Sequence, residues 1–288
     1  MDDMLKHNIG RIVNEYNNRD LPEFEGYSPL EMQFIVYDPL GEGSPIQLLE
    51  LPERDYDRIP ILKQIKYLLK IIEEAGELKL TAKGFLPTKI VSDIYAQGFI
   101  KDEMIEAGIS KLYKETDAKA INLTRILAEL SRVVKKRNGK LSLTKKGREQ
   151  LNDNHRLLEN VFKTFGMKFN WGYYDGYDND IVGQLGFGFS LILVSKYGSE
   201  KRLDLFYAEK YLSAFPMLIE QMTPSRYRSN EEQAARCYAL RTFERFLDYF
   251  GIIKIEPGPE WNSPKSIEKT ELYDKLIKVR PPGYVYKA

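Results

Sequence analysis

Hydrophobic residues recur at helical spacing over much of the chain, and short runs that alternate apolar and polar residues interrupt this pattern. The helical spacing is typical of amphipathic helices, whereas the alternation is typical of strands with one buried face. We therefore expect a mainly α-helical protein with small antiparallel β-hairpins, which is an α+β fold class. The pattern predicts longer helices at 101–108, 119–130, 181–197, 205–222 and 231–250.

One of these helices has an alternative interpretation. Gly183, Gly186 and Gly188 disfavour a helix at 181–197, and the apolar run 187–194 is also compatible with a strand. Gly198 stands where the C-terminal cap of a helix is expected, so we favour the helix.

Residues 1–60 are predicted to form an acidic N-terminal arm that wraps around the rest of the protein. Ser28 is a typical N-cap, Pro29 suits the first helical position, and Glu31 completes a capping box. The helix should continue through Tyr37 and end before Pro39, because proline cannot continue it. Several helix breakers at 41–45 then predict a loop.

A short internal repeat follows the arm. Residues 76–84 match residues 139–147 at a constant offset of 63 positions. In the second copy, Asn138 and Gly139 favour a tight hairpin turn between strands at 131–137 and 140–144, because both residue types tolerate positive φ. Thr144 is then expected to cap a helix that begins at Lys145.

A third, looser copy lies near the C-terminus. It consists of a helix at 242–250, strands at 252–255 and 266–269, and a helix at 271–278 preceded by Thr270. This order predicts tandem winged-helix-like units in which each hairpin is a wing. The expected domains are the arm, a repeat region at 61–165 with a partial first copy and a complete second copy, and a C-terminal winged-helix-like domain at 166–288.

Composition narrows the class of protein. The chain has 288 residues, 43 Lys and Arg, 42 Asp and Glu, two His and one Cys. One cysteine excludes an internal disulfide framework, and so few His and Cys argue against a zinc site. No apolar run is long enough to cross a membrane, and no signal sequence is evident at the N-terminus. We therefore expect a cytoplasmic protein with no membrane association, no metal and no cofactor.

The net charge of the whole chain is only +1, but the charge is distributed unevenly along it. Segments 1–60, 61–165 and 166–288 carry net charges of −8, +8 and +1. A basic middle segment is compatible with a nucleic-acid partner, but an acidic arm that docks on a basic segment of the same chain gives the same numbers.

The most basic stretch coincides with the predicted second hairpin and the start of the helix after it. Seven cations and no acid fall between positions 135 and 148, namely Lys135, Lys136, Arg137, Lys140, Lys145, Lys146 and Arg148. On a wing, these side chains are suited to contact phosphates. The preceding helix offers Asn122, Thr124 and Arg125 to a major groove. The alternative is an exposed hairpin whose charges serve solubility and prevent edge pairing.

An aromatic and acidic cluster at 171–180 is a second candidate. Trp171, Tyr174, Asp175 and Asp178 could form a recognition loop for a basic peptide or a nucleobase. The alternative is a domain linker anchored by Phe169 and Trp171. No catalytic constellation or phosphate-binding fingerprint is present, so an enzyme with a site near 171–180 is the least favoured hypothesis.

Several segments resemble an uncharacterised bacterial protein family, and the resemblance spans most of the chain. The segments are 26–32 (GYSPLEM), 79–87 (KLTAKGFLP), 140–147 (KLSLTKKG), 169–171 (FNW) and 206–210 (FYAEK). Some relatives in this family are joined to SEC-C-type motifs, which this chain lacks. The resemblance implies a shared fold with tandem winged-helix-like repeats, and it implies no activity and no catalytic residue.

The leading functional hypothesis is a non-enzymatic binding protein that contacts DNA or RNA through the basic hairpin. Its alternative is a protein interaction scaffold in which the winged units are packing modules and exposed aromatic residues such as Trp261 capture the partner.

Overall fold

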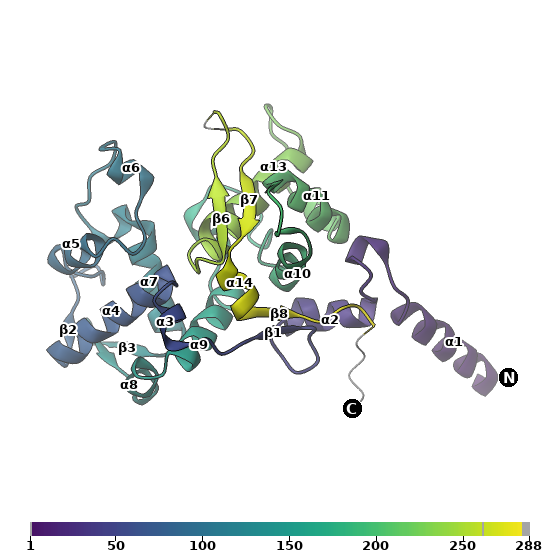
Figure 1. Ribbon diagram of the computed structural model, residues 1–288, viewed down its shortest axis with the longest axis horizontal. Coiled ribbons are helices and arrows are strands. Elements are labelled where there is room, and N and C mark those ends of the chain that lie inside the picture. Colours follow the sequence, from purple (N-terminus) through teal and green to yellow (C-terminus); the bar gives the residue numbers. More distant parts are fainter. Residues whose placement is uncertain (1, 261, 284–288) are drawn as a thin grey trace. The chain divides into compact units, whose positions relative to one another are not determined.

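The structure is a computed structural model that describes residues 2–260 and 262–283 (Figure 1). It is rich in helices and contains three small antiparallel sheets among the described residues, which confirms the expected α+β class. None of the described helices is long and apolar enough to cross a membrane. Trp261, the aromatic residue proposed for partner capture, lies outside the described residues.

Contacts between residues divide the chain into two compact units. Unit 1 comprises residues 1–49, 171–245 and 253–288, and unit 2 comprises residues 50–170 and 246–252. The expected domains at 1–60, 61–165 and 166–288 stay a prediction, because a division by contacts does not test which segments fold independently.

Unit 2 contains a group of helices and a three-stranded sheet. The helices are α3 (Glu53–Tyr56), α4 (Pro60–Ala75), α5 (Thr88–Ala96), α6 (Glu103–Glu106), η2 (Glu115–Asp117), α7 (Lys119–Leu130), α8 (Lys145–Leu151) and α9 (Asn154–Met167). The strands are β2 (Leu78–Lys79), β3 (Val134–Arg137) and β4 (Lys140–Leu143), in the order β2-β4-β3. Helix α7 confirms the prediction at 119–130, whereas the helix predicted at 101–108 is reduced to the single turn of α6.

The core of unit 2 lies between α4, α7 and α9. Helix α4 has a strongly apolar stripe, and Ile65, Leu68 and Ile72 on it are completely buried. Phe162 and Phe165 of α9 pack on Phe246 and Phe250, with ring centroids 4.6 to 6.1 Å apart. This aromatic cluster draws the segment 246–252 into unit 2 although its chain neighbours belong to unit 1.

The second repeat forms the hairpin that its sequence predicts. Asn138 and Gly139 have φ values of +49° and +69°, which are the left-handed values that a two-residue turn requires. Thr144 caps α8, and its hydroxyl accepts a hydrogen bond from the backbone N–H of Gly147 at 2.9 Å.

The first repeat folds differently from the second. Its strand β2 has two residues and pairs with β4, so that Leu78 lies opposite Leu141 and Lys79 lies opposite Lys140. The chain then turns at Gly84, whose φ is +80°, and forms no second strand before α5. The two similar sequences therefore lie antiparallel in one sheet, and the first supplies the third strand of the second copy's sheet.

Unit 1 contains the remaining elements. Its helices are α1 (Asp2–Asn17), η1 (Pro22–Phe24), α2 (Pro29–Tyr37), η3 (Trp171–Tyr174), α10 (Phe187–Tyr197), α11 (Asp204–Ala214), α12 (Met217–Glu220), α13 (Asn230–Ala239), most of the π-helix η4 (Leu240–Leu247) and α14 (Glu271–Leu276). Strands β5 (Arg202–Leu203), β6 (Ile253–Glu256) and β7 (Ser266–Lys269) form a sheet in the order β5-β7-β6, and β6 and β7 lie side by side in Figure 1. Strand β1 (Ile46–Leu48) pairs with β8 (Ile277–Val279).

Some predicted boundaries in unit 1 are confirmed and others are wrong. Ser28 and Glu31 form the expected capping box of α2. Helix α10 begins only at Phe187, because Gly183 and Gly186 adopt positive φ. Three further boundaries differ from prediction: helix 205–222 is broken after α11, helix 231–250 becomes a π-helix after α13, and helix 271–278 ends at Leu276 so that β8 can pair with β1.

The two units share one order of elements. In unit 2, a long helix, a short strand, further helices, a hairpin and a helix follow one another as α4, β2, α5 to α7, β3, β4 and α8. Unit 1 repeats this order as α10, β5, α11 to η4, β6, β7 and α14. In both sheets, the short strand pairs with the second strand of the hairpin. This similarity covers a much longer stretch than the sequence repeat.

We predict that Gly147→Ala destabilises unit 2. A Cβ at this position would lie 1.9 Å from the carbonyl oxygen of Val133, so the backbone must shift. We expect a loss of about 2 kcal/mol in unfolding free energy, as for other overpacked sites. Urea denaturation followed by circular dichroism measures this loss. Gly176→Ala is the matched control, because a Cβ there meets nothing within 4 Å; equal midpoints for the two variants would contradict the prediction.

Candidate nucleic-acid interface

The outer face of the β2-β4-β3 sheet is strongly basic. Leu78, Val134, Leu141 and Leu143 turn inward and are buried, so the alternate positions point to solvent. Strand register places Lys79 opposite Lys140 and Lys140 opposite Arg137, which makes one row of three cations across three strands. Lys135 lies two residues before Arg137 on the same face. We call these four exposed residues, Lys79, Lys135, Arg137 and Lys140, the basic face.

The other predicted cations lie outside this face and are also exposed. Lys136 points to the opposite side of β3, and its ammonium donates to the carbonyl of Gly84 at 3.2 Å. Lys145, Lys146 and Arg148 lie on α8, where Lys146 donates to the carbonyl of Ser131 at 3.3 Å. The structure therefore keeps all seven cations of the predicted hairpin region accessible.

Little negative charge balances these cations among the described residues. Lys140 forms an ion pair of 2.7 Å with Glu77, and Lys145 lies 3.9 Å from Glu149. All four side chains are about half exposed or more, so such pairs contribute little to stability. The hydrogen bond from Lys140 holds the pKa of Glu77 below its usual value.

The cations of this region repel one another, which lowers the stability of the free protein, and a bound anion would relieve this repulsion. Like charges that lie directly opposite one another in a sheet are destabilising, and the row of the basic face contains two such pairs. Partial burial of the ammonium lowers the pKa of Lys146, and repulsion from Lys168 and Arg132 lowers it further. Phosphate oxygens near these groups would favour their charged forms.

Arg125 does not belong to the accessible cations, contrary to the predicted interface. Its guanidinium is buried, and its Nε donates to Glu115 at 2.7 Å while another nitrogen pairs with Glu129. Glu115 has no exposed surface, and it also accepts hydrogen bonds from the Asn122 amide and the backbone N–H of Leu86. Arg125 compensates a buried carboxylate and is unavailable to a phosphate.

The other residues expected to face a major groove are buried too. The Thr124 hydroxyl accepts a hydrogen bond from Gln64 at 2.7 Å, and Asn122 is bonded to Glu115. Only Lys119 and Leu130, at the ends of α7, are exposed. The expectation that this helix reads base edges is therefore wrong for the described conformation, since its side chains face the core.

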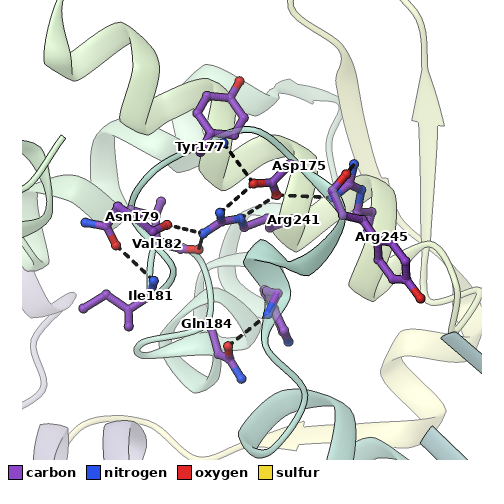
Figure 2. Close-up of polar contacts among 10 residues, drawn as sticks. Asp175, Tyr177, Asn179, Ile181, Val182, Gln184, Arg241 and Arg245 are labelled. Atoms are coloured by element: carbon purple, nitrogen blue, oxygen red, sulfur yellow. Dashed lines mark hydrogen bonds and ion pairs between the residues drawn. The ribbon is translucent and has the colours of Figure 1, made fainter. Parts of the chain in front are cut away.

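The predicted recognition loop at 171–180 is also corrected in part. Figure 2 shows Asp175 pointing at Arg241, and the Nε and Nη2 atoms of this arginine each donate to the carboxylate at 2.8 Å. Trp171 is buried, whereas Asp178 is exposed and Tyr174 is intermediate. Trp171 and Asp175 anchor the segment to the fold, which leaves them unavailable for recognition.

Arg241 is the centre of this anchor. Its side chain has no exposed surface, and its Nη1 donates to the carbonyls of Asn179 and Val182 at 2.7 and 3.2 Å (Figure 2). Arg245 adds a second contact with Asp175 at 3.2 Å. The sequence signal for this role is an arginine close to the apolar residues Tyr238, Ala239 and Phe243, which are buried, because a buried charge needs a partner.

Sequence reasoning missed Lys79 as a member of the basic face. Its strand belongs to the first repeat, which is distant in the sequence from the hairpin. The available signal was the alternation in 77–80, which matches that in 140–143.

We predict that Arg241→Gln strongly destabilises unit 1. The variant leaves Asp175 buried with one weaker basic partner, and breaking a buried ion pair costs about 3 to 5 kcal/mol. Urea unfolding followed by tryptophan fluorescence reports on this region, because Trp171 is buried there. Arg228→Gln removes a partly exposed ion pair with Glu232 and should change stability by less than about 1 kcal/mol. Similar losses in the two variants would refute a structural role for Arg241.

Among the described residues, no group of three or more His, Cys, Asp or Glu side chains is placed to hold a metal ion. The basic face is therefore the candidate site with the clearest chemistry, and that chemistry is anion binding.

Comparisons with known proteins concern unit 2. The comparisons with curated proteins and with solved structures find no match. Residues 57–156 match the family model of the Y4jL N-terminal domain, which agrees with the expected resemblance to an uncharacterised bacterial family. The matched range contains β2, the hairpin and α8, and hence the whole basic face. Over this range, the chain is similar to the Y4jL N-terminal domain.

Proposed function

We propose that unit 2 binds the sugar-phosphate backbone of double-stranded nucleic acid through the basic face. The observation that carries this proposal is the row of Lys79, Lys140 and Arg137 across three strands, with Lys135 beside it. Such a row lowers the stability of the free protein, because its like charges repel one another. A bound anionic ligand would relieve this repulsion. The exposed cations of α8 add further positive charge to unit 2.

The order of elements supports tandem winged-helix-like units as part of this proposal. In this interpretation, the β3-β4 hairpin is the wing and α7 occupies the position of a recognition helix. Because α7 is almost completely buried, contact would come from the wing sheet and not from the helix. The relation to a family with tandem repeats and SEC-C-linked members belongs to the same proposal.

The chemistry of the face favours backbone contacts over base recognition. Lys and Arg neutralise phosphates, and such contacts position a protein without reading sequence. Single-strand binders also use aromatic side chains on which bases stack. On the outer face of this sheet, the position opposite Lys135 is Ser142, which cannot stack on a base. We therefore expect similar affinity for duplexes of different sequence and weaker binding to single strands.

The geometry of the row suits a duplex groove. Neighbouring strands lie about 4.8 Å apart, so the row spans about 10 Å between its outer backbones. Extended lysine and arginine side chains from this span can reach phosphates on both sides of a minor groove, which is about 6 Å wide. This binding mode needs no enzyme chemistry. We therefore propose that the protein is a non-enzymatic binding protein of the cytoplasm.

A protein interaction scaffold is the second candidate, and one observation on unit 1 favours it. Ile9, Ile12, Val13 and Tyr16 form a stripe along α1, and each is 50 to 61% exposed. An apolar stripe on a helix is typical of a surface that packs on a partner.

We predict that the full chain binds a labelled duplex with steep salt dependence. Four phosphate contacts give a slope of log K against log salt of about −3.6, and contacts from α8 would make it steeper. Fluorescence anisotropy at several salt concentrations measures the slope. If no salt-dependent binding is found at low ionic strength, the proposal is wrong and the scaffold becomes the favoured function.

We further predict that the double variant Lys79→Gln with Arg137→Gln binds at least about tenfold more weakly and loses about two units of salt slope. Lys89→Gln with Lys111→Gln is the control, because it removes equal charge from exposed lysines of unit 2 outside the basic face and its surrounding cations. Equal losses in both double variants would indicate attraction by net charge, and would contradict a site at the basic face.

A further inference from the structure

Unit 1 contains a pocket that none of the functions above uses. Its volume is about 520 Å³, and it lies between the start of α11, helices α13 and η4, and the loop that precedes β7. This volume is within the range of small-ligand sites. Its walls combine the apolar side chains of Leu205 and Leu240 with acidic and basic groups.

Most charges in the wall already have partners within the protein. Glu244 pairs with Lys265 at 2.7 Å, and Glu232 pairs with Arg236 at 3.2 Å. These four side chains are between one quarter and one half exposed, so they lie at the rim. The rim therefore has two acids and two bases, and it contributes no net charge.

Asp204 in the pocket wall differs from the rim. The residue is 7% exposed, and its carboxylate accepts hydrogen bonds from the backbone N–H groups of Leu205 and Lys265 at 2.7 and 3.1 Å. No lysine or arginine side chain among the described residues lies within ion-pair distance of it. Burial raises the pKa of Asp204, although these hydrogen bonds and the nearby charges of Lys265 and Arg236 lower it. The pocket thus has an excess negative charge at a desolvated position.

Other buried carboxylates of the protein have partners that differ from those of Asp204. Asp175 has two arginine partners, Glu115 has Arg125, and Glu25 has Lys196 and Lys210. Among the described residues, Glu31 has no basic partner, and three donors from Ser28 and Gly283 bond to its carboxylate. Asp204 combines burial, two backbone donors and a place in the wall of an open pocket, and this combination favours a cation from outside.

We propose that this pocket binds the arginine side chain of a partner peptide. The guanidinium would lie against Asp204, and the aliphatic stem would pack on Leu205 and Leu240. A planar guanidinium carries five donors and keeps its charge when desolvated, so it can satisfy Asp204 and a rim carboxylate together. A metal ion fits poorly, because no group of three or more acidic, His or Cys ligands occurs among the described residues.

The anchor in Figure 2 positions one edge of this pocket. Tyr177 lines the pocket, and its backbone N–H donates to Asp175 at 3.2 Å. The Asp175 and Arg241 pair therefore holds the loop that carries Tyr177. The proposed site lies entirely within unit 1 and does not rest on nucleic-acid binding by unit 2.

The test is a titration of the ¹⁵N-labelled full chain with a Gly-Gly-Arg-Gly-Gly peptide, followed by NMR. We expect a Kd of about 1 mM, with shifts confined to residues near 204–205, 232–244 and 262–265. A peptide with Gln in place of Arg should not bind. Putrescine, a free diamine, is expected to bind more weakly than the arginine peptide. No shifts at about 10 mM peptide, equal binding of the Gln peptide, or tighter binding of putrescine would each overturn the proposal.

Two variants locate the contact. Asp204→Asn should weaken binding at least tenfold, and its spectrum shows whether the loop before β7 stays folded. Glu232→Lys changes an exposed rim position without touching the core, and we expect at least fivefold weaker binding by repulsion. Glu220→Gln removes an exposed carboxylate outside the pocket and should leave binding unchanged. Unchanged binding in Glu232→Lys would refute the assignment to this pocket.

Discussion

The pairing of β2 with β4 is the constraint on which unit 2 and its candidate site depend. Two residues of β2 extend the hairpin to three strands, which buries Leu78 beside Leu141 on the inner face. The same register fixes Lys79 opposite Lys140 on the outer face. Because side chains alternate along a strand, burial of the leucines forces the lysines into one exposed row. The core and the basic face are therefore two consequences of a single register.

Charged residues divide into those that hold the fold and those that remain available. Arg125 and Arg241 are buried against Glu115 and Asp175, where the loss of either partner would leave an uncompensated charge. The sequence context of Arg125 also suggests ligand contact. Exposure separates the two roles, because an exposed cation can exchange water for phosphate whereas a buried one cannot leave its partner.

The two units show that one order of elements can carry different chemistry. The hairpin of unit 2 and the start of its following helix concentrate cations, whereas the corresponding part of unit 1 borders a pocket with mixed rim charges and a buried aspartate. A fold of this kind presents a helix and a hairpin, and the side chains on them decide the ligand. The structure thus supports separate proposals for the two units.

Local chemistry was enough to predict several elements. The capping box at Ser28, the turn at Asn138 and Gly139, and the cap at Thr144 depend on residues a few positions apart. The exposure of Lys135, Arg137 and Lys140 also agrees with the alternation of the hairpin strands. The mixed fold class followed from the same periodicities.

Contacts between distant residues decided the rest. The place of Lys79 depends on a strand pair separated by about 60 positions, and the burial of Arg125 depends on a carboxylate from another segment. The end of α14 at Leu276 depends likewise on β1, which comes from the N-terminal region. Sequence periodicity reports which face of an element is buried, but not which segment buries it. Tertiary structure alone therefore decided which cations form the basic face and which are sealed in the core.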